Sequence, residues 1–116
     1  MSEPLKACVF PEPIRGLPQA DVPLAGVTAY LSQSDNHQIL FMTFEEDVEV
    51  PEHSHGPQWS VVLEGRIELV IGGVENVFTK GDRYFIAEGV RHSGFIHAGY
   101  ADISWFGDKG RYRARP

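Results

Sequence analysis

Hydrophobic and polar residues alternate along this chain in short runs, and this pattern predicts a protein built of β-strands. Runs that alternate with a period of two, or that are rich in β-branched and aromatic residues, are typical of strands. No segment keeps the i, i+3, i+4, i+7 spacing of an amphipathic helix over three turns. The predicted strands cover residues 27–31, 38–44, 48–50, 58–64, 66–71, 75–79, 83–87, 91–96 and 100–106. Many short strands joined by glycine-containing turns indicate an all-β sandwich or barrel.

The region before the first predicted strand is different, because five of the eight prolines fall within residues 1–25. Proline lacks a backbone donor, so we expect neither a central strand nor a helix there. We therefore predict an extended proline-rich N-terminal arm over residues 1–25, a β-barrel over residues 26–108 and a basic C-terminal tail over residues 109–116. The arm is expected to lie along the barrel or against a partner subunit, and the tail to be solvated.

The composition limits the partners and the location of the protein. A length of 116 residues argues for one domain, and the formal net charge of −6 disfavours a nucleic-acid surface, which needs a basic face. Cys8 is the only cysteine, so no internal disulfide can form and we expect an inert thiol. No apolar run approaches the ~20 residues that span a membrane. The N-terminus lacks the features of a signal peptide, so the expected location is cytoplasmic.

Two of the five histidines stand two residues apart in the stretch EHSHGPQW, residues 52–59. Residues i and i+2 of a strand point to one face, ~6.6 Å apart along it, so His53 and His55 can lean toward a common point. Gln58 follows after a bend, and His92 begins another strand after a glycine-containing turn. Three imidazoles and one amide oxygen would hold a divalent transition metal and leave coordination positions open.

The alternative interpretation is that the histidine pair lies in a solvated loop, because a bare His-x-His is a short motif. The two remaining histidines are not candidate ligands. His37 falls in a polar turn, so we expect it to be exposed. His97 is out of phase with an inward-facing His92, so we expect it to point outward.

The first histidine stretch resembles a motif of the cupin superfamily. That motif combines a His-x-His pair, a glutamate and a glycine that ends the strand. In VEVPEHSHGPQWSVVLEG, His53 and His55 match the pair and Gly65 matches the final glycine. Gln58 stands seven residues before Gly65, where the family usually has glutamate, and it follows His55 one residue sooner than in the common form.

The stretch around His92, GDRYFIAEGVRHSGFI, resembles the second cupin motif. Gly81, Gly89 and His92 match, whereas Ala87 and Ile96 replace the family's proline and asparagine. The resemblance implies a small double-stranded β-helix, or jelly-roll, barrel with a metal inside. Carried over residue by residue, the metal ligands would be His53, His55, Gln58 and His92.

The sequence leaves the metal open among iron, manganese, nickel and zinc, because affinity order more than fold sets the preference. A glutamate ligand would cancel one unit of the ion's charge, whereas the neutral amide of Gln58 would leave the full double charge. Such an ion attracts anions more strongly. We therefore predict a small, anionic organic ligand. We also expect metal affinity to fall below about pH 6, as the histidines protonate.

Three functions stay open on the sequence alone. The first is a metal-dependent enzyme, such as a dioxygenase or an isomerase, with the hydroxyls of Ser60 and Tyr84 as candidate catalytic or orienting groups. The second is a binding or sensing barrel without turnover, and the third is a structural barrel without metal. We find no carboxylate dyad, and the absence of an obvious acid–base residue favours binding over catalysis.

Alternation predicts which residues line the barrel and which face out. If Gln58 points inward, Trp59, Val61 and Leu63 face outward. These apolar residues and the arm need cover, so we expect a homodimer. The candidates for the cavity lining are Phe41, Met42, Trp105, Phe106 and one of Tyr84 and Phe85.

Overall fold

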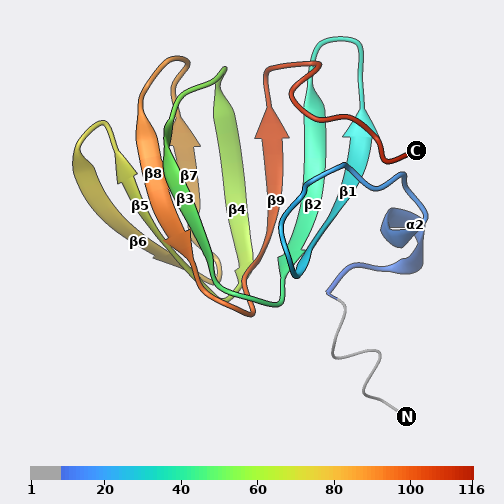
Figure 1. Cartoon of the computed structure of the whole chain (residues 1–116), viewed down its shortest axis with the longest axis horizontal. Coiled ribbons are helices and arrows are strands. Elements are labelled where there is room, and N and C mark those ends of the chain that lie inside the picture. Colours follow the sequence, from blue (N-terminus) through green and yellow to red (C-terminus); the bar gives the residue numbers. More distant parts are fainter. Residues whose placement is uncertain (1–8) are drawn as a thin grey trace.

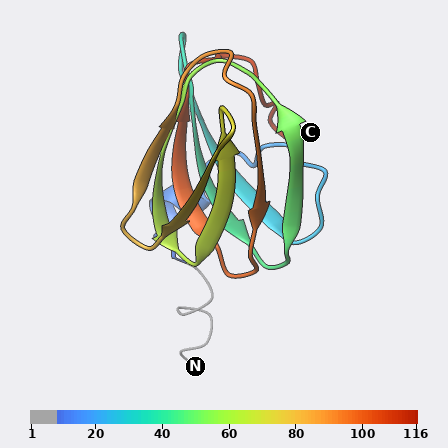
Figure 2. The ribbon, with the colours of Figure 1, turned by 90° about the vertical axis from the view of Figure 1, so that its left-hand side faces the viewer.

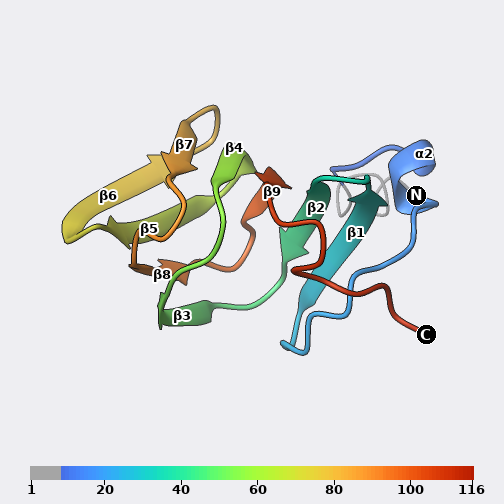
Figure 3. The same ribbon diagram turned by 90° about the horizontal axis from the view of Figure 1, so that it is seen from above.

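The computed structural model describes residues 9–116, which form two antiparallel β-sheets (Figure 1). The five-stranded sheet has the order β1-β2-β9-β4-β7 and the four-stranded sheet the order β3-β8-β5-β6. The strands are β1 Val27–Gln33, β2 Gln38–Phe44, β3 Val48–His53, β4 Gln58–Glu64, β5 Arg66–Ile71, β6 Val74–Thr79, β7 Arg83–Ile86, β8 His92–Ile96 and β9 Ala101–Phe106. The sheets face each other in the view from above (Figure 3). The predicted all-β fold is therefore confirmed.

The interior lies between the sheets because each strand turns alternate side chains inward. On β2, Leu40 and Met42 are buried, and on β4 the side chain of Trp59 faces out with 40% of its surface exposed. The sequence left open whether Tyr84 or Phe85 of strand β7 faces inward. Tyr84 is buried in the interior, whereas Phe85 is 56% exposed.

Strand β3 extends further than the sequence predicts. We expected Pro51 to stop it after Val50, but β3 continues to His53. Proline is tolerated here because β3 is an edge strand, and the pairing with β8 is interrupted between Val50 and His53. Pro51 therefore lacks its N–H at a position where β3 makes no regular pairing with β8, and the pairing resumes at His53.

The turn between β4 and β5 requires a glycine. Gly65 has a φ of +80°, and a Cβ at this position would lie 2.7 Å from the Cα of Tyr100. The absence of a side chain lets the chain pass close to Tyr100 as it leaves one sheet for the other. Beyond this turn, β5 and β6 form the hairpin that faces the viewer in Figure 2.

The arm is not wholly extended, so the expectation of no helix there is wrong. A single turn, α2 (Glu12–Arg15), follows Pro11, and Pro13 occupies its first turn, where a missing N–H costs no hydrogen bond. Within residues 9–116 there is no helix long and apolar enough to cross a membrane. Residues 1–8, including Cys8, lie outside the described residues, so the inert thiol stays a prediction.

The arm then runs along its own barrel and meets the C-terminal segment. The Ala20 amide donates to the carbonyl of Ala29 on β1 (2.8 Å), and the Asp21 amide donates to the carbonyl of Arg113 (2.7 Å). The Arg115 amide donates to the carbonyl of Gln19 (2.7 Å). The predicted tail is therefore attached to the arm through its backbone, although most of its residues are exposed. The domain boundaries at residues 26 and 108 stay predictions.

Candidate metal centre

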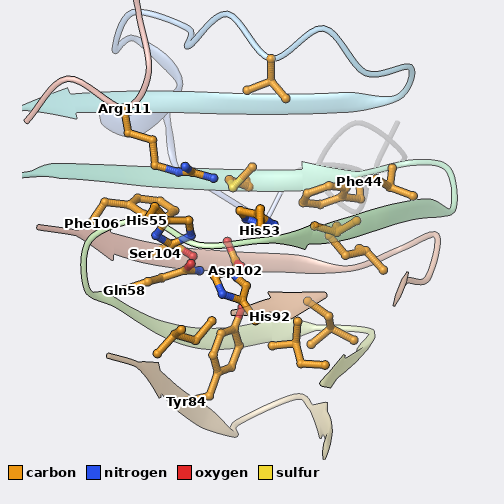
Figure 4. A pocket seen from close by; sticks show the side chains of 18 of the residues that line it. Phe44, His53, His55, Gln58, Tyr84, His92, Asp102, Ser104, Phe106 and Arg111 are labelled. Atoms are coloured by element: carbon orange, nitrogen blue, oxygen red, sulfur yellow. The ribbon is translucent and has the colours of Figure 1, made fainter. Parts of the chain in front are cut away.

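Three histidines meet at one end of the space between the sheets (Figure 4). His53 ends β3, His92 begins β8, and the two are cross-strand partners. His55 lies in the loop after β3, so the loop, and not the alternation of a strand, brings its ring beside that of His53. The ring centroids of His53 and His92 are 4.3 Å apart, and those of His55 and His92 are 4.7 Å apart. One nitrogen from each of the three rings lies within 4.8 Å of the others.

Backbone carbonyls orient all three rings in the same way. Nδ1 of His53 lies 2.9 Å from the carbonyl oxygen of Pro51, Nδ1 of His55 lies 2.7 Å from that of Gly56, and Nδ1 of His92 lies 3.0 Å from that of Val90. A carbonyl can only accept, so each Nδ1 carries the proton and donates. Each Nε2 is then left with a free lone pair, which is the arrangement of metal-binding histidines.

Burial favours the neutral form of two of these rings, those of His55 and His92. It lowers the pKa of His55 to about 4, and it also lowers the pKa of His92. The charge of Arg111 lowers both values further. These two histidines are therefore uncharged at neutral pH and can donate a lone pair to a cation. Three converging imidazoles fit a divalent transition metal, so His53, His55 and His92 could hold one.

Gln58 begins β4 and also faces the cavity. Its Nε2 donates to Oγ of Ser60 (3.0 Å), and Ser60 Oγ is paired with Oγ of Ser104 (2.7 Å). This contact fixes the amide so that Oε1 stays available as an acceptor or a ligand. Ser60 is fully buried behind Gln58 and is not part of the cavity lining.

The histidines open into a cavity of about 260 Å³ between the two sheets. Of the expected lining residues, Met42, Phe106 and Tyr84 are present, whereas Phe41 and Trp105 are not. Apolar side chains from both sheets and from the arm make up most of the remaining lining. An apolar cavity with a few polar groups at one end is typical of small-molecule sites.

Tyr84 belongs to a buried hydrogen-bonded group. Its hydroxyl lies 3.4 Å from that of Tyr100, which donates to Oδ2 of Asp102 (2.7 Å). Burial raises the pKa of both phenols well above the usual range, so Tyr84 can donate a hydrogen bond but is not a base near neutral pH. Burial also raises the pKa of Asp102 to about 7, and its Oδ1 has no hydrogen-bond partner.

The sequence analysis missed two charged residues of the cavity, Asp102 and Arg111. A signal for Asp102 was present, because it shares the alternation of β9 with Phe106, an expected lining residue. It places a carboxyl where we expected no obvious acid–base residue. Arg111 carried no signal, since its segment looked like a basic tail.

The other two histidines are not in this cluster. His97 faces outward, and its Nε2 lies 2.6 Å from a carboxylate oxygen of Glu68. His37 is half-buried beside Trp105, with 6.0 Å between the ring centroids. Neither lines the cavity.

Comparison with known proteins identifies the fold. A family model described as a cupin domain matches residues 40–106, whereas no curated protein matches the chain. Among similar solved structures is an RmlC-like cupin from Shewanella frigidimarina, with 24% sequence identity and a TM-score of 0.70, covering 81% of this chain and 86% of that chain.

Two similar structures are larger enzymes. Salicylate 1,2-dioxygenase from Pseudoaminobacter salicylatoxidans shares 16% identity, with a TM-score of 0.63, over 74% of this chain and 26% of that chain. Oxalate decarboxylase from Bacillus subtilis shares 17% identity, with a TM-score of 0.66, over 84% of this chain and 29% of that chain. At these identities the likeness shows the fold alone, the jelly-roll barrel. Because the family model covers more than half of the sequence, this chain belongs to the cupin family.

Proposed function

We propose that this cupin binds one divalent transition metal through His53, His55 and His92, with Gln58 Oε1 as a fourth ligand, and holds a small, anionic organic molecule beside it. The observation that carries the proposal is the convergence of three ring nitrogens within 4.8 Å, each ring held at Nδ1 by a carbonyl. Iron, manganese, nickel and zinc all suit imidazole ligands.

When bound, the metal supplies Lewis acidity or, with iron or manganese, a centre for oxygen chemistry. The chain supplies the other parts of the site. The Ser60 hydroxyl holds the Gln58 amide, Tyr84 offers a neutral phenol, and the apolar wall excludes water. A neutral amide among the ligands leaves the charge of the ion uncancelled, which favours an anionic ligand.

A metal-dependent enzyme and a binding barrel without turnover both suit this site. Asp102 favours the enzyme, because a buried carboxyl with a pKa of about 7 can take up and release a proton near neutral pH. The buried, already paired hydroxyl of Ser60 favours binding. Oxygen uptake by an iron-loaded sample, over a panel of small acids, tests for a dioxygenase, and analysis of the same acids for a changed product tests for an isomerase. A binding barrel should show neither.

Elemental analysis tests the metal site. We expect purified protein incubated with zinc or nickel to retain about one ion per chain after desalting, because three imidazoles converge. His92→Ala should lose the ion, since a ligand is removed from the cluster. His37→Ala is the matched control and should keep the ion. An ion that survives in His92→Ala, or a wild-type protein that retains none, would overturn the proposal.

We also propose a homodimer that forms through the outer face of the five-stranded sheet. Trp59 is 40% exposed, and its cross-strand neighbour Phe85 on β7 is 56% exposed. Trp105 is the neighbour of Trp59 on β9. A second copy would cover these aromatic side chains by two-fold symmetry.

A further inference from the structure

The guanidinium of Arg111 lies at the histidine end of the cavity without a charged partner. Its side chain points from the C-terminal segment into the cavity (Figure 4). Its carbon Cζ is 5.5 Å from the ring centroid of Phe106 and 5.1 Å from that of Tyr112. Its Nε is buried and has no hydrogen-bond partner. Across residues 9–116, no carboxylate forms an ion pair with it.

The segment that carries Arg111 is fixed on both sides. Before it, Oδ2 of Asp108 accepts from the amide of Gly56 (2.8 Å), in the loop that carries His55. A Cβ on Gly56 would clash with the carboxylate of Asp108, so a larger residue here would displace that side chain. After it, the fully buried Gln38 donates to the carbonyl of Tyr112 (2.8 Å) and accepts from its amide (3.0 Å). Arg111 is therefore held in place rather than carried on a free tail.

The charges around the cavity leave the histidine end positive. Arg111 is close enough to the cluster to lower the pKa of His55 and His92. Asp102 is the only carboxyl among the described residues that line the cavity, and its raised pKa of about 7 makes it a weak counter-ion at or below neutral pH. An unpaired guanidinium over an aromatic ring is suited to binding a carboxylate through two parallel N–H donors.

The opposite end of the cavity is apolar. There Val48 and Ile96 are cross-strand partners on β3 and β8, the same two strands that pair His53 with His92 at the histidine end. Val48 and His53 are five positions apart on β3, and Ile96 and His92 are four positions apart on β8, which corresponds to about 15 Å along the strands. A ligand that fills the cavity therefore meets a cation at one end and hydrocarbon at the other.

We propose that Arg111 is the residue that recognises the ligand, and that the ligand is a monocarboxylate with an apolar body. The carboxylate pairs with the guanidinium beside the histidines, and the apolar body lies between the sheets. The inference rests on the proposed function, since it assigns a ligand class to the same site. It goes further in assigning the recognition to a residue of the C-terminal segment, beyond the matched cupin domain.

Calorimetric titration of the zinc-loaded and the metal-free wild-type protein tests the ligand class. Three probes of similar length are compared: hexanoate, its neutral amide hexanamide, and the dicarboxylate adipate. We expect hexanoate to bind roughly tenfold to hundredfold more tightly than hexanamide, because the amide loses charge-assisted hydrogen bonds. Adipate should also bind more weakly, since its second carboxylate would enter the apolar end. Equal binding of hexanoate and hexanamide, or no binding of hexanoate, would overturn the inference.

The variant Arg111→Met tests the residue itself. We expect hexanoate affinity to fall roughly tenfold to hundredfold, with Arg111→Lys in between because lysine keeps the charge but not the paired donors. The matched control is Arg113→Met, an exposed arginine on the same segment, which should bind as the wild type does. Unchanged hexanoate binding by Arg111→Met, with an unchanged melting temperature, would contradict the inference.

The metal content of every sample is measured in parallel, so the two proposals can fail separately. If Arg111→Met retains zinc but no longer binds hexanoate, the metal site and the role of Arg111 are both supported. A wild-type protein without zinc whose hexanoate binding still depends on Arg111 would refute the metal site and keep the inference. Retained zinc without a preference for hexanoate would refute the inference alone.

Discussion

Asp102 shows how strongly a single residue depends on its surroundings. The same carboxyl on the surface would be charged, but at 3% exposure burial raises its pKa to about 7. A group whose pKa is raised on folding contributes stability that is fully present below its unfolded pKa and is lost as the pH rises through its folded pKa. Asp102 therefore makes the folded state less stable on the alkaline side of neutrality.

Replacing Asp102 with asparagine should remove this pH dependence. Between pH 5 and pH 8.5, the wild type should lose about 2–3 kcal/mol of unfolding free energy that Asp102→Asn keeps. Urea denaturation in the presence of a chelator measures the difference. Asp35→Asn, in the exposed turn between β1 and β2, is the control and should follow the wild type. Parallel curves for Asp102→Asn and the wild type would show that Asp102 does not titrate in this range.

At the scale of elements, the loop between β3 and β4 builds most of the site. It starts at His53, carries His55 and ends at Gln58, and its Gly56 receives the C-terminal segment through Asp108. The alternation of the sequence predicted β2, β4 and β5 with the bounds observed. The expectations that were based on proline were wrong at β3 and α2, because the cost of a proline depends on whether its N–H would have had a partner.

The burial of this loop and of β8 changes the expected pH dependence of metal binding. We first expected affinity to fall below about pH 6, as for ordinary imidazoles. Because burial lowers the pKa of His55 to about 4 and also lowers that of His92, protons compete with the metal for these two ligands only in more acidic solution. Zinc affinity should be measured by chelator competition from pH 7.5 to 4.5. It should therefore begin to fall at a lower pH than the zinc affinity of free imidazole does. A complete loss of affinity by pH 6 would contradict this expectation.

At the scale of the whole molecule, the two sheets leave one aromatic surface uncovered. Trp59, Phe85 and Trp105 are cross-strand neighbours on the outer face of the five-stranded sheet. Within residues 9–116, Phe85 is 56% exposed, so the described part of the arm does not cover it. This exposure is the structural support for self-association.

The variant Trp59→Ser should weaken the proposed dimer, because it removes the largest side chain at the centre of this surface. Light scattering coupled to size-exclusion chromatography should give the dimer mass for the wild type and a lower mass for the variant at equal concentration. Val77→Ser, an exposed position on β6 of the other sheet, is the control and should remain dimeric. A monomeric wild type, or an unchanged dimer in Trp59→Ser, would refute the interface.

The sequence by itself determined most of the strands and singled out the three histidines, because strands follow a short periodicity and histidine is a typical metal ligand. It determined the inward faces only in part, since Phe41 and Trp105 do not line the cavity. Only the tertiary structure decided which distant residues share the cavity. Arg111 looked like part of a solvated tail, yet Gln38 and Gly56 hold its segment at the histidine end. Asp102 looked like one polar residue of an alternating strand, yet burial changes its pKa. Both effects depend on contacts between residues far apart in the chain, and local patterns do not encode such contacts.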